Sequence, residues 1–188
     1  NPETGENAKK STGSFYTPRD IVDYMVDNSI LEYLKEKTNI EDERLKALIS
    51  YGKEDDELAV FNKSEKKSII NALYTVTVLD PACGSAEFLT EILKQLYAKK
   101  YSGNVIIKGW DSSESAISTS RFLLNYEKEN TWHQRLSFDI RSVEDSLNED
   151  WGIDNDIILM NPPFVSWELL NKTQIEVVNY IFMDRFIG

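Results

Sequence analysis

The residues with the most distinctive chemistry are Asn161-Pro162-Pro163-Phe164, which follow the apolar run Ile157–Met160. Neither proline has a backbone N–H, and the ring of each proline fixes φ. Proline also holds the preceding residue extended, which constrains Asn161 and Pro162. We therefore expect a stiff loop that presents carbonyl oxygens beside an aromatic ring. The alternative is a rigid turn with a buried Phe164, and the neighbouring motifs favour the first interpretation.

A second motif runs from Asp80 to Leu89 and reads DPACGSAEFL. Small side chains in such a turn let a ligand approach the backbone, and the N-terminus of a following helix offers N–H groups to an anion such as a carboxylate. Asp80, placed at a strand end, can accept hydrogen bonds from a ligand ammonium group. An ordinary tight turn is the alternative. The pattern G-x-G-x-x-G of dinucleotide-binding proteins is absent, which disfavours a dehydrogenase.

A third motif, Gly109-Trp110-Asp111, ends the next apolar run. A carboxylate at this position can hold both hydroxyls of a ribose in nucleotide-binding α/β folds. Acids often end strands, so Asp111 alone says little. Together with the Asp80 motif it indicates a cofactor that contains adenosine.

The elements that must position these motifs alternate between two hydrophobic periods. We expect strands over 74–79, 105–110, 136–140 and 157–160 and helices over 87–100 and 113–126. Upstream, we expect a helix with Thr17 as its cap, a charged helix over 40–50, and a short helix from Ser64 to Leu73. Alternating strands and helices predict a mainly parallel, three-layer α/β sheet that binds ligands at the carboxyl ends of its strands. The predicted domains are a helical segment, 1–73, and an α/β domain, 74–188.

Composition restricts the setting of this chain. It has 188 residues, 41% of them hydrophobic, and a net charge of −11, whereas a freestanding DNA-binding protein needs a basic face. No apolar run is long enough to span a bilayer. With one cysteine, Cys83, and one histidine, His133, we expect no disulfide and no structural zinc site, which suits a cytoplasmic protein.

In their order along the chain, the three motifs resemble those of S-adenosylmethionine-dependent DNA adenine-N6 methyltransferases. The upstream segment Thr12–Pro18 also resembles the segment that precedes the cofactor loop in one subgroup of these enzymes. That subgroup carries its target-recognition domain last and includes enzymes of restriction-modification systems. The resemblance covers roughly residues 12–170 and implies a Rossmann-like class I methyltransferase fold.

The resemblance assigns a role to each matching position of the cofactor site. Tyr16 and Thr17 would lie against the methionine end of S-adenosylmethionine, and Asp111 and Ser112 would hold its ribose and border its adenine. The amino-acid moiety would be lined by Asp80, Ala82 and Gly84. Asp139, which we expect to end the third strand, would approach the adenine amine. Asp145 is the competing candidate, but we expect it to lie in a helix.

At the catalytic loop, the resemblance implies that the Asn161 side-chain oxygen and the Pro162 carbonyl accept both hydrogens of adenine N6. The amine is a poor nucleophile because its lone pair is delocalised, and these acceptors would stabilise the charge that develops on nitrogen. Phe164 would stack on the adenine once it leaves the duplex.

Two departures from the family pattern leave alternatives open. Ala86 stands where the family usually has glycine, and a positive φ there would strain it. The chain also stops before the remaining strands and the recognition domain, so we expect a fragment of a longer enzyme whose basic groove lies in another domain or subunit. A specificity or nuclease subunit, or a fused nuclease, is a possible partner. The alternatives are a methyltransferase for protein glutamine or RNA, and a non-catalytic interaction module with the same fold.

Overall fold

The computed structural model describes residues 17–46, 61–99, 101, 103–161, 172 and 176. The chain forms two compact units, and nearly all described residues belong to the unit Pro18–Asn161. Among the predicted site residues, Tyr16, Pro162 and Phe164 lie outside the described part of the chain.

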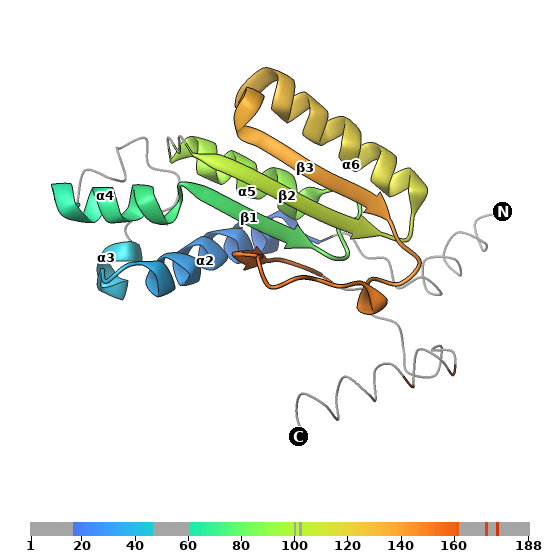
Figure 1. Ribbon diagram of the computed structural model, residues 1–188, viewed down its shortest axis with the longest axis horizontal. Coiled ribbons are helices and arrows are strands. Elements are labelled where there is room, and N and C mark those ends of the chain that lie inside the picture. Colours follow the sequence, from blue (N-terminus) through green and yellow to red (C-terminus); the bar gives the residue numbers. More distant parts are fainter. Residues whose placement is uncertain are drawn as a thin grey trace. The chain divides into compact units, whose positions relative to one another are not determined.

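A parallel sheet forms the centre of this unit (Figure 1). Its strands are β1 (Thr75–Asp80), β2 (Asn104–Asp111), β3 (Leu136–Ser142) and β4 (Ile157–Ile158), in the spatial order β3-β2-β1-β4. The chain builds outward from β1 on one side through β2 and β3, and then crosses to the other side for β4. This reversal beside β1 is where open α/β sheets form ligand crevices, at the carboxyl ends of the strands.

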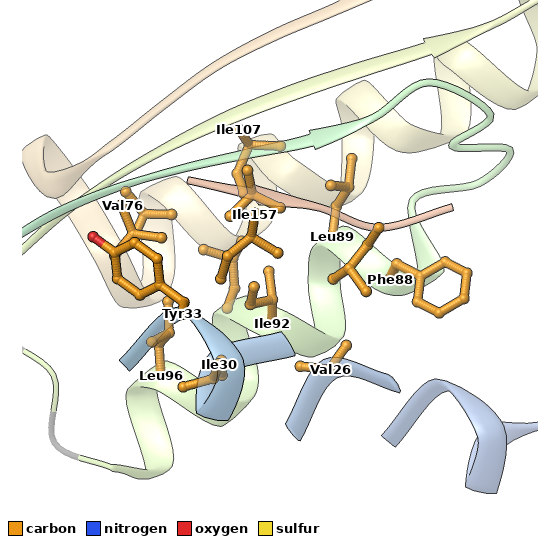
Figure 2. Close-up of a cluster of buried hydrophobic side chains, with 14 of the residues drawn as sticks. Val26, Ile30, Tyr33, Val76, Phe88, Leu89, Ile92, Leu96, Ile107 and Ile157 are labelled. Atoms are coloured by element: carbon orange, nitrogen blue, oxygen red, sulfur yellow. The ribbon is translucent and has the colours of Figure 1, made fainter. Parts of the chain in front are cut away.

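Three helices pack on one face of the sheet, because their apolar stripes match the inward residues of the strands. They are α2 (Arg19–Lys37), α5 (Glu87–Ala98) and α6 (Glu114–Glu127); α5 contacts β1, β2, α2 and α6. Figure 2 shows Val26 and Ile30 of α2 beside Ile92 of α5, with Ile107 of β2 and Ile157 of β4 nearby. The core therefore joins the upstream helix α2 to the α/β elements.

In β2 and β3, buried residues of this core face alternate with more exposed residues of the opposite face, whereas β1 is buried from Val76 to Asp80. In β3, Leu136 and Ile140 are buried, whereas Asp139 and Arg141 are exposed. The described residues thus supply the sheet and one helical layer of the three layers predicted. The parallel α/β architecture is confirmed. The boundary predicted at residue 73 marks a change of secondary structure within one packed unit.

Several predicted element ends need correction. Pro18, not Thr17, is the N-cap of α2, since the first helical bonds run from Ile21 and Val22 to the Pro18 carbonyl. Asn62, not Ser64, is the N-cap of the helix α4 (Lys63–Ala72). Its side chain accepts a hydrogen bond from the Glu65 N–H, and the Glu65 side chain accepts one from the Asn62 N–H in return. Within the helix predicted over 40–50, the described residues contain α3 (Asp42–Leu45), and residues 47–50 lie outside the described residues.

None of the helices in the described part of the chain combines the length and the apolar composition needed to cross a membrane.

Candidate cofactor site

The loop between β1 and α5 folds back over the end of β2. The backbone N–H of Cys83 donates to the carbonyl of Trp110, 2.8 Å away, and that of Ala86 donates to the Cys83 carbonyl at 2.8 Å. Asp80 starts the turn by accepting a bond from the Ala82 N–H at 3.0 Å. The tips of the two neighbouring strands are thereby joined, as the sequence motifs predict.

Gly84 is held at both of its polar backbone groups. Its N–H donates to Oδ2 of Asp111 at 2.9 Å, and its carbonyl accepts from the hydroxyl of Ser120 on α6 at 2.7 Å. Its φ is +51°, in the left-handed region that favours glycine, and a Cβ built on it would meet nothing within 4 Å. Space beside Gly84 and a fixed backbone are what close approach of a ligand requires.

Asp80 supplies a buried carboxylate that lacks part of its hydrogen bonding. The residue is fully buried, and Oδ2 has no hydrogen-bond partner among the described residues. Burial raises the pKa of this carboxyl to about 7, the Ala82 N–H opposes the rise, and the nearby Asp111 adds to it. Such an oxygen favours a cationic partner, so Asp80 fits the predicted contact with an ammonium group.

Ala86 ends the loop in a strained conformation. It is the N-cap of α5 with φ 65° and ψ 34°, and its side chain is fully buried. Ala86 therefore has the positive φ that strains an alanine, and this left-handed conformation costs about 1 kcal/mol. Alanine has no side-chain acceptor, so it cannot cap the first N–H groups of α5.

Gly109 is closely packed beneath the loop. A Cβ at this position would lie 2.7 Å from Cδ1 of Ile140, 2.9 Å from Cδ1 of Leu89 and 3.1 Å from the sulfur of Cys83. A larger residue would require the ends of the Ile140 and Leu89 side chains to shift. This packing favours glycine before Trp110-Asp111.

Asp111 lies at the predicted strand tip and uses both oxygens. Besides the bond from Gly84, it accepts one from the Ser113 N–H at 2.8 Å. Each carboxylate oxygen has a further lone pair, so the group can still accept hydroxyl donors. Ser112 follows it and is exposed, as a residue bordering a ligand must be.

The prediction that Asp139 ends the third strand is wrong, because β3 continues to Ser142. Asp139 pairs in register with Lys108 in mid-strand, and its exposed side chain lies 3.7 Å from Arg141. Asp145, expected inside a helix, instead follows the strand end and accepts a bond from the Leu147 N–H.

Asn161 stands at the same end of the sheet as Asp80. The N–H of Leu159 donates to the carbonyl of Leu79 at 3.0 Å, so the chain continues beside β1 past the two residues of β4. Asn161 follows two residues later and is partly buried. Thr17 is buried.

Ser120 was not singled out from the sequence. A signal was present, since it lies at helical spacing between Ile117 and Leu124, and all three are buried. A hydroxyl on the apolar side of a helix needs a buried partner, which here is Gly84. Cys83 is also buried in this loop, and burial raises its thiol pKa to about 12.

Comparison with known proteins identifies the family of this chain. The model of the family described as N-6 DNA Methylase matches residues 66–184. A protein of Methanocaldococcus jannaschii, provisionally named a type II restriction enzyme and methyltransferase, is 34% identical over 98 residues. Those residues are 48% of this chain and 8% of that protein.

A solved structure from Listeria monocytogenes, provisionally named a class I S-adenosylmethionine-dependent methyltransferase, resembles 76% of this chain and 58% of its own. The TM-score is 0.38 and the sequence identity 17%. The family match spans the cofactor loop, the Asp111 tip and the Asn161 loop, and the chain belongs to the N-6 DNA Methylase family.

Proposed function

We propose that this chain binds S-adenosylmethionine at the carboxyl ends of β1 and β2 and, within a longer enzyme, methylates the N6 amine of adenine in DNA. The observation that carries the proposal is the buried Asp80 carboxylate, whose Oδ2 has no partner among the described residues, beside a loop with open space at Gly84. Family membership supports the reaction class. The chain spans 8% of the length of the relative it matches.

The residues present fit this cofactor. Asp80 would accept hydrogen bonds from its ammonium group, and the first N–H groups of α5 would face its carboxylate. The remaining lone pairs of Asp111 would accept from the ribose hydroxyls, and Ser112 would border the adenine. Ala82 and Gly84 would line the amino-acid moiety through their backbone. Tyr16 and Thr17 would contact the methionine end of the cofactor.

We place the acid near the adenine amine at Asp145 in preference to Asp139. Ligands of parallel sheets bind beyond the carboxyl ends of the strands. Asp145 follows the end of β3, whereas Asp139 lies three residues before it with its side chain beside Arg141. The same register that moves Asp139 away from the tip therefore favours Asp145.

S-adenosylmethionine supplies the methyl group of the reaction. The part of this chain is to orient and polarise the acceptor: the Asn161 side-chain oxygen and the Pro162 carbonyl would accept the two N6 hydrogens. These fixed acceptors favour a pyramidal nitrogen and stabilise the positive charge that develops on it. Phe164 would stack on the flipped base, which leaves the duplex before it can reach the site.

Calorimetric titration of the 188-residue chain with S-adenosylmethionine tests the cofactor site. We expect a one-to-one complex that is lost in Asp80→Ala and kept in Asp154→Ala, an exposed carboxylate away from the loop. Absence of binding by the parent chain would contradict the cofactor assignment and favour an interaction module that keeps the fold.

The reaction is tested on the complete enzyme with DNA, RNA and protein substrates and mass-spectrometric detection of the product. We expect N6-methyladenine in DNA. Methylated glutamine, or methylated RNA with unmodified DNA, would replace the DNA assignment by one of the two alternative substrates.

The proposed macromolecular substrate is duplex DNA, held mainly by a domain or subunit outside this chain, with a specificity or nuclease partner; the proposed location is the cytoplasm. We place the main DNA-binding surface outside this chain because the chain has a net charge of −11 and no basic run longer than two residues. In gel shifts at low salt, this chain alone should retain little DNA. Sub-micromolar retention would show that the chain carries its own DNA-binding face.

A further inference from the structure

The cofactor loop is fixed from a helix that has no part in the sequence motifs. Ser120 of α6 is fully buried, and its hydroxyl donates to the carbonyl of Gly84 at 2.7 Å, 36 residues earlier in the chain. Among the described residues, the other side-chain donor near this carbonyl is the Cys83 thiol, at 3.8 Å. A thiol is a weak donor, so the hydroxyl of Ser120 makes the stronger of these two bonds.

The position of Gly84 depends on two bonds that act on opposite sides of one residue. Asp111 accepts from its N–H and Ser120 donates to its carbonyl. The left-handed φ of +51° is reached by glycine without cost, but glycine also reaches many other conformations. Together with the backbone bonds of Cys83 and Ala86, these two side-chain bonds select this one conformation.

We propose that Ser120 is a positioning residue for the cofactor loop. By holding the Gly84 carbonyl against α6, it keeps the Gly84 backbone in the conformation that a ligand at the β1 and β2 tips contacts. Ser120 itself touches no ligand. This inference rests on the proposed cofactor site, and it assigns to α6 a part in binding that none of the motifs carries.

The test compares two serines of the same helix. Ser120→Ala removes the hydroxyl that reaches Gly84, whereas Ser118→Ala removes an exposed hydroxyl that donates only to the Glu114 carbonyl of its own helix. Both variants change one serine of α6 to the better helix former. Any difference between them therefore reports the contact with the loop.

The first measurement needs no ligand: hydrogen exchange of the Gly84 and Ala86 amides in the 188-residue chain. Ser120→Ala should accelerate exchange at both amides by about fivefold, the scale of one lost hydrogen bond, while exchange in β2 and β3 stays unchanged. The second is calorimetry with S-adenosylmethionine, where Kd should rise five- to tenfold in Ser120→Ala. Ser118→Ala should match the parent chain in both.

Two further variants at Ser120 separate positioning from folding. Ser120→Thr keeps the hydroxyl and Ser120→Cys keeps only a weak donor, so loop protection and affinity should follow the order Ser, Thr, Cys, Ala. A merely structural serine would instead lower the unfolding temperature in Ser120→Ala without changing exchange at the loop under native conditions. Should Ser120→Ala fail to fold, the contrast between Thr and Cys gives the same comparison.

The inference is overturned if Ser120→Ala matches Ser118→Ala in loop exchange, or if loop exchange rises while Kd stays at the parent value. Failure of the proposed function has a different signature. In that case the parent chain does not bind S-adenosylmethionine at all, and the exchange comparison still decides whether Ser120 holds the loop.

Discussion

The carboxylate of Asp111 accepts a hydrogen bond from the backbone N–H of Gly84, 2.9 Å away and 27 residues earlier in the chain. The same side chain accepts from the Ser113 N–H, at the start of α6. Asp111 therefore fixes the cofactor loop and the next helix to the tip of β2. The group proposed to hold the ribose thus also holds the loop between β1 and α5.

Replacing Asp111 should weaken cofactor binding through the loop as well as through the ribose. Asp111→Ala removes both backbone bonds, and we expect Kd for S-adenosylmethionine to rise at least tenfold in calorimetry. Asp111→Asn keeps one acceptor oxygen and should lie between this variant and the parent. Asp150→Ala is the control, because Asp150 makes the same kind of bond to the Gly152 N–H in an exposed turn. Equal affinities in Asp111→Ala and Asp150→Ala would remove Asp111 from the site.

The raised pKa of Asp80, about 7, predicts a pH-dependent affinity. The ammonium of the cofactor binds the ionised carboxylate, so a proton must leave Asp80 on binding below pH 7. From pH 7.0 to 5.5, where an α-amino group with a pKa of about 7.7–8.0 stays mostly protonated, affinity should fall about 15-fold. Calorimetry in buffers of different ionisation heat should detect one proton released. Asp80→Asn should abolish this pH dependence; if the parent shows none, Asp80 does not bind the ammonium group.

The same pKa shift acts on stability with the opposite trend. The unfolded carboxyl ionises from its ordinary pKa of 3.8, whereas the folded one keeps its proton to about 7, so the ligand-free fold loses stability as pH rises between these values. Asp80→Asn keeps the acceptor for the Ala82 N–H and removes the buried charge. Its thermal unfolding midpoint at pH 8 should therefore exceed that of the parent.

Ala86→Gly separates backbone strain from crowding of the ligand. The left-handed φ of 65° is already present without a cofactor, so relief of strain should stabilise the fold by about 1 kcal/mol, or a few degrees in Tm. Tighter binding of S-adenosylmethionine would show in addition that the Ala86 methyl crowds the ligand. Ala116→Gly, in the first turn of α6, should destabilise by a similar amount. A lower Tm in Ala86→Gly would show that the buried methyl outweighs the strain.

Asn161→Ala in the complete enzyme should leave cofactor affinity near the parent value, because the proposed cofactor contacts come from the β1 and β2 tips. Loss of one fixed acceptor on adenine N6 should slow methyl transfer by two to three orders of magnitude. Single-turnover methylation measures this step. Asn148→Ala, an exposed asparagine, should be unaffected. A near-parent rate in Asn161→Ala would exclude Asn161 from the mechanism.

The sequence predicts the order of elements well because each has a clear hydrophobic period. The helix start at Glu87 and the strand beginning at Leu136 agree with the structure, and Ser113 caps α6 next to its predicted start. Positions that depend on a neighbouring strand are predicted less well. Asp139 looks terminal because Ile140 is the last apolar residue of its run, but pairing with β2 carries β3 on to Ser142.

Sequence periodicity cannot predict every contact and backbone conformation of the site. The roles of Asp80 and Asp111 follow from strand tips, which local patterns locate. The bond from Ser120 to Gly84 depends on how α6 packs over the loop, and no local pattern encodes that distance. The positive φ of Ala86 could be stated only as a condition, because alanine by itself favours ordinary helical backbone.

Both polar anchors of Gly84 come from chain that is made later: Asp111 follows it by 27 residues and Ser120 by 36. During synthesis at about 5–20 residues per second, the loop emerges roughly 2–7 s before its second anchor exists. Until then, β1 can pair with β2, but the Gly84 carbonyl lacks the hydrogen bond from Ser120 that holds it in the folded chain. Ligand binding should therefore be acquired late in biogenesis, and nascent chains halted before residue 120 should contain the complete cofactor motif without its affinity.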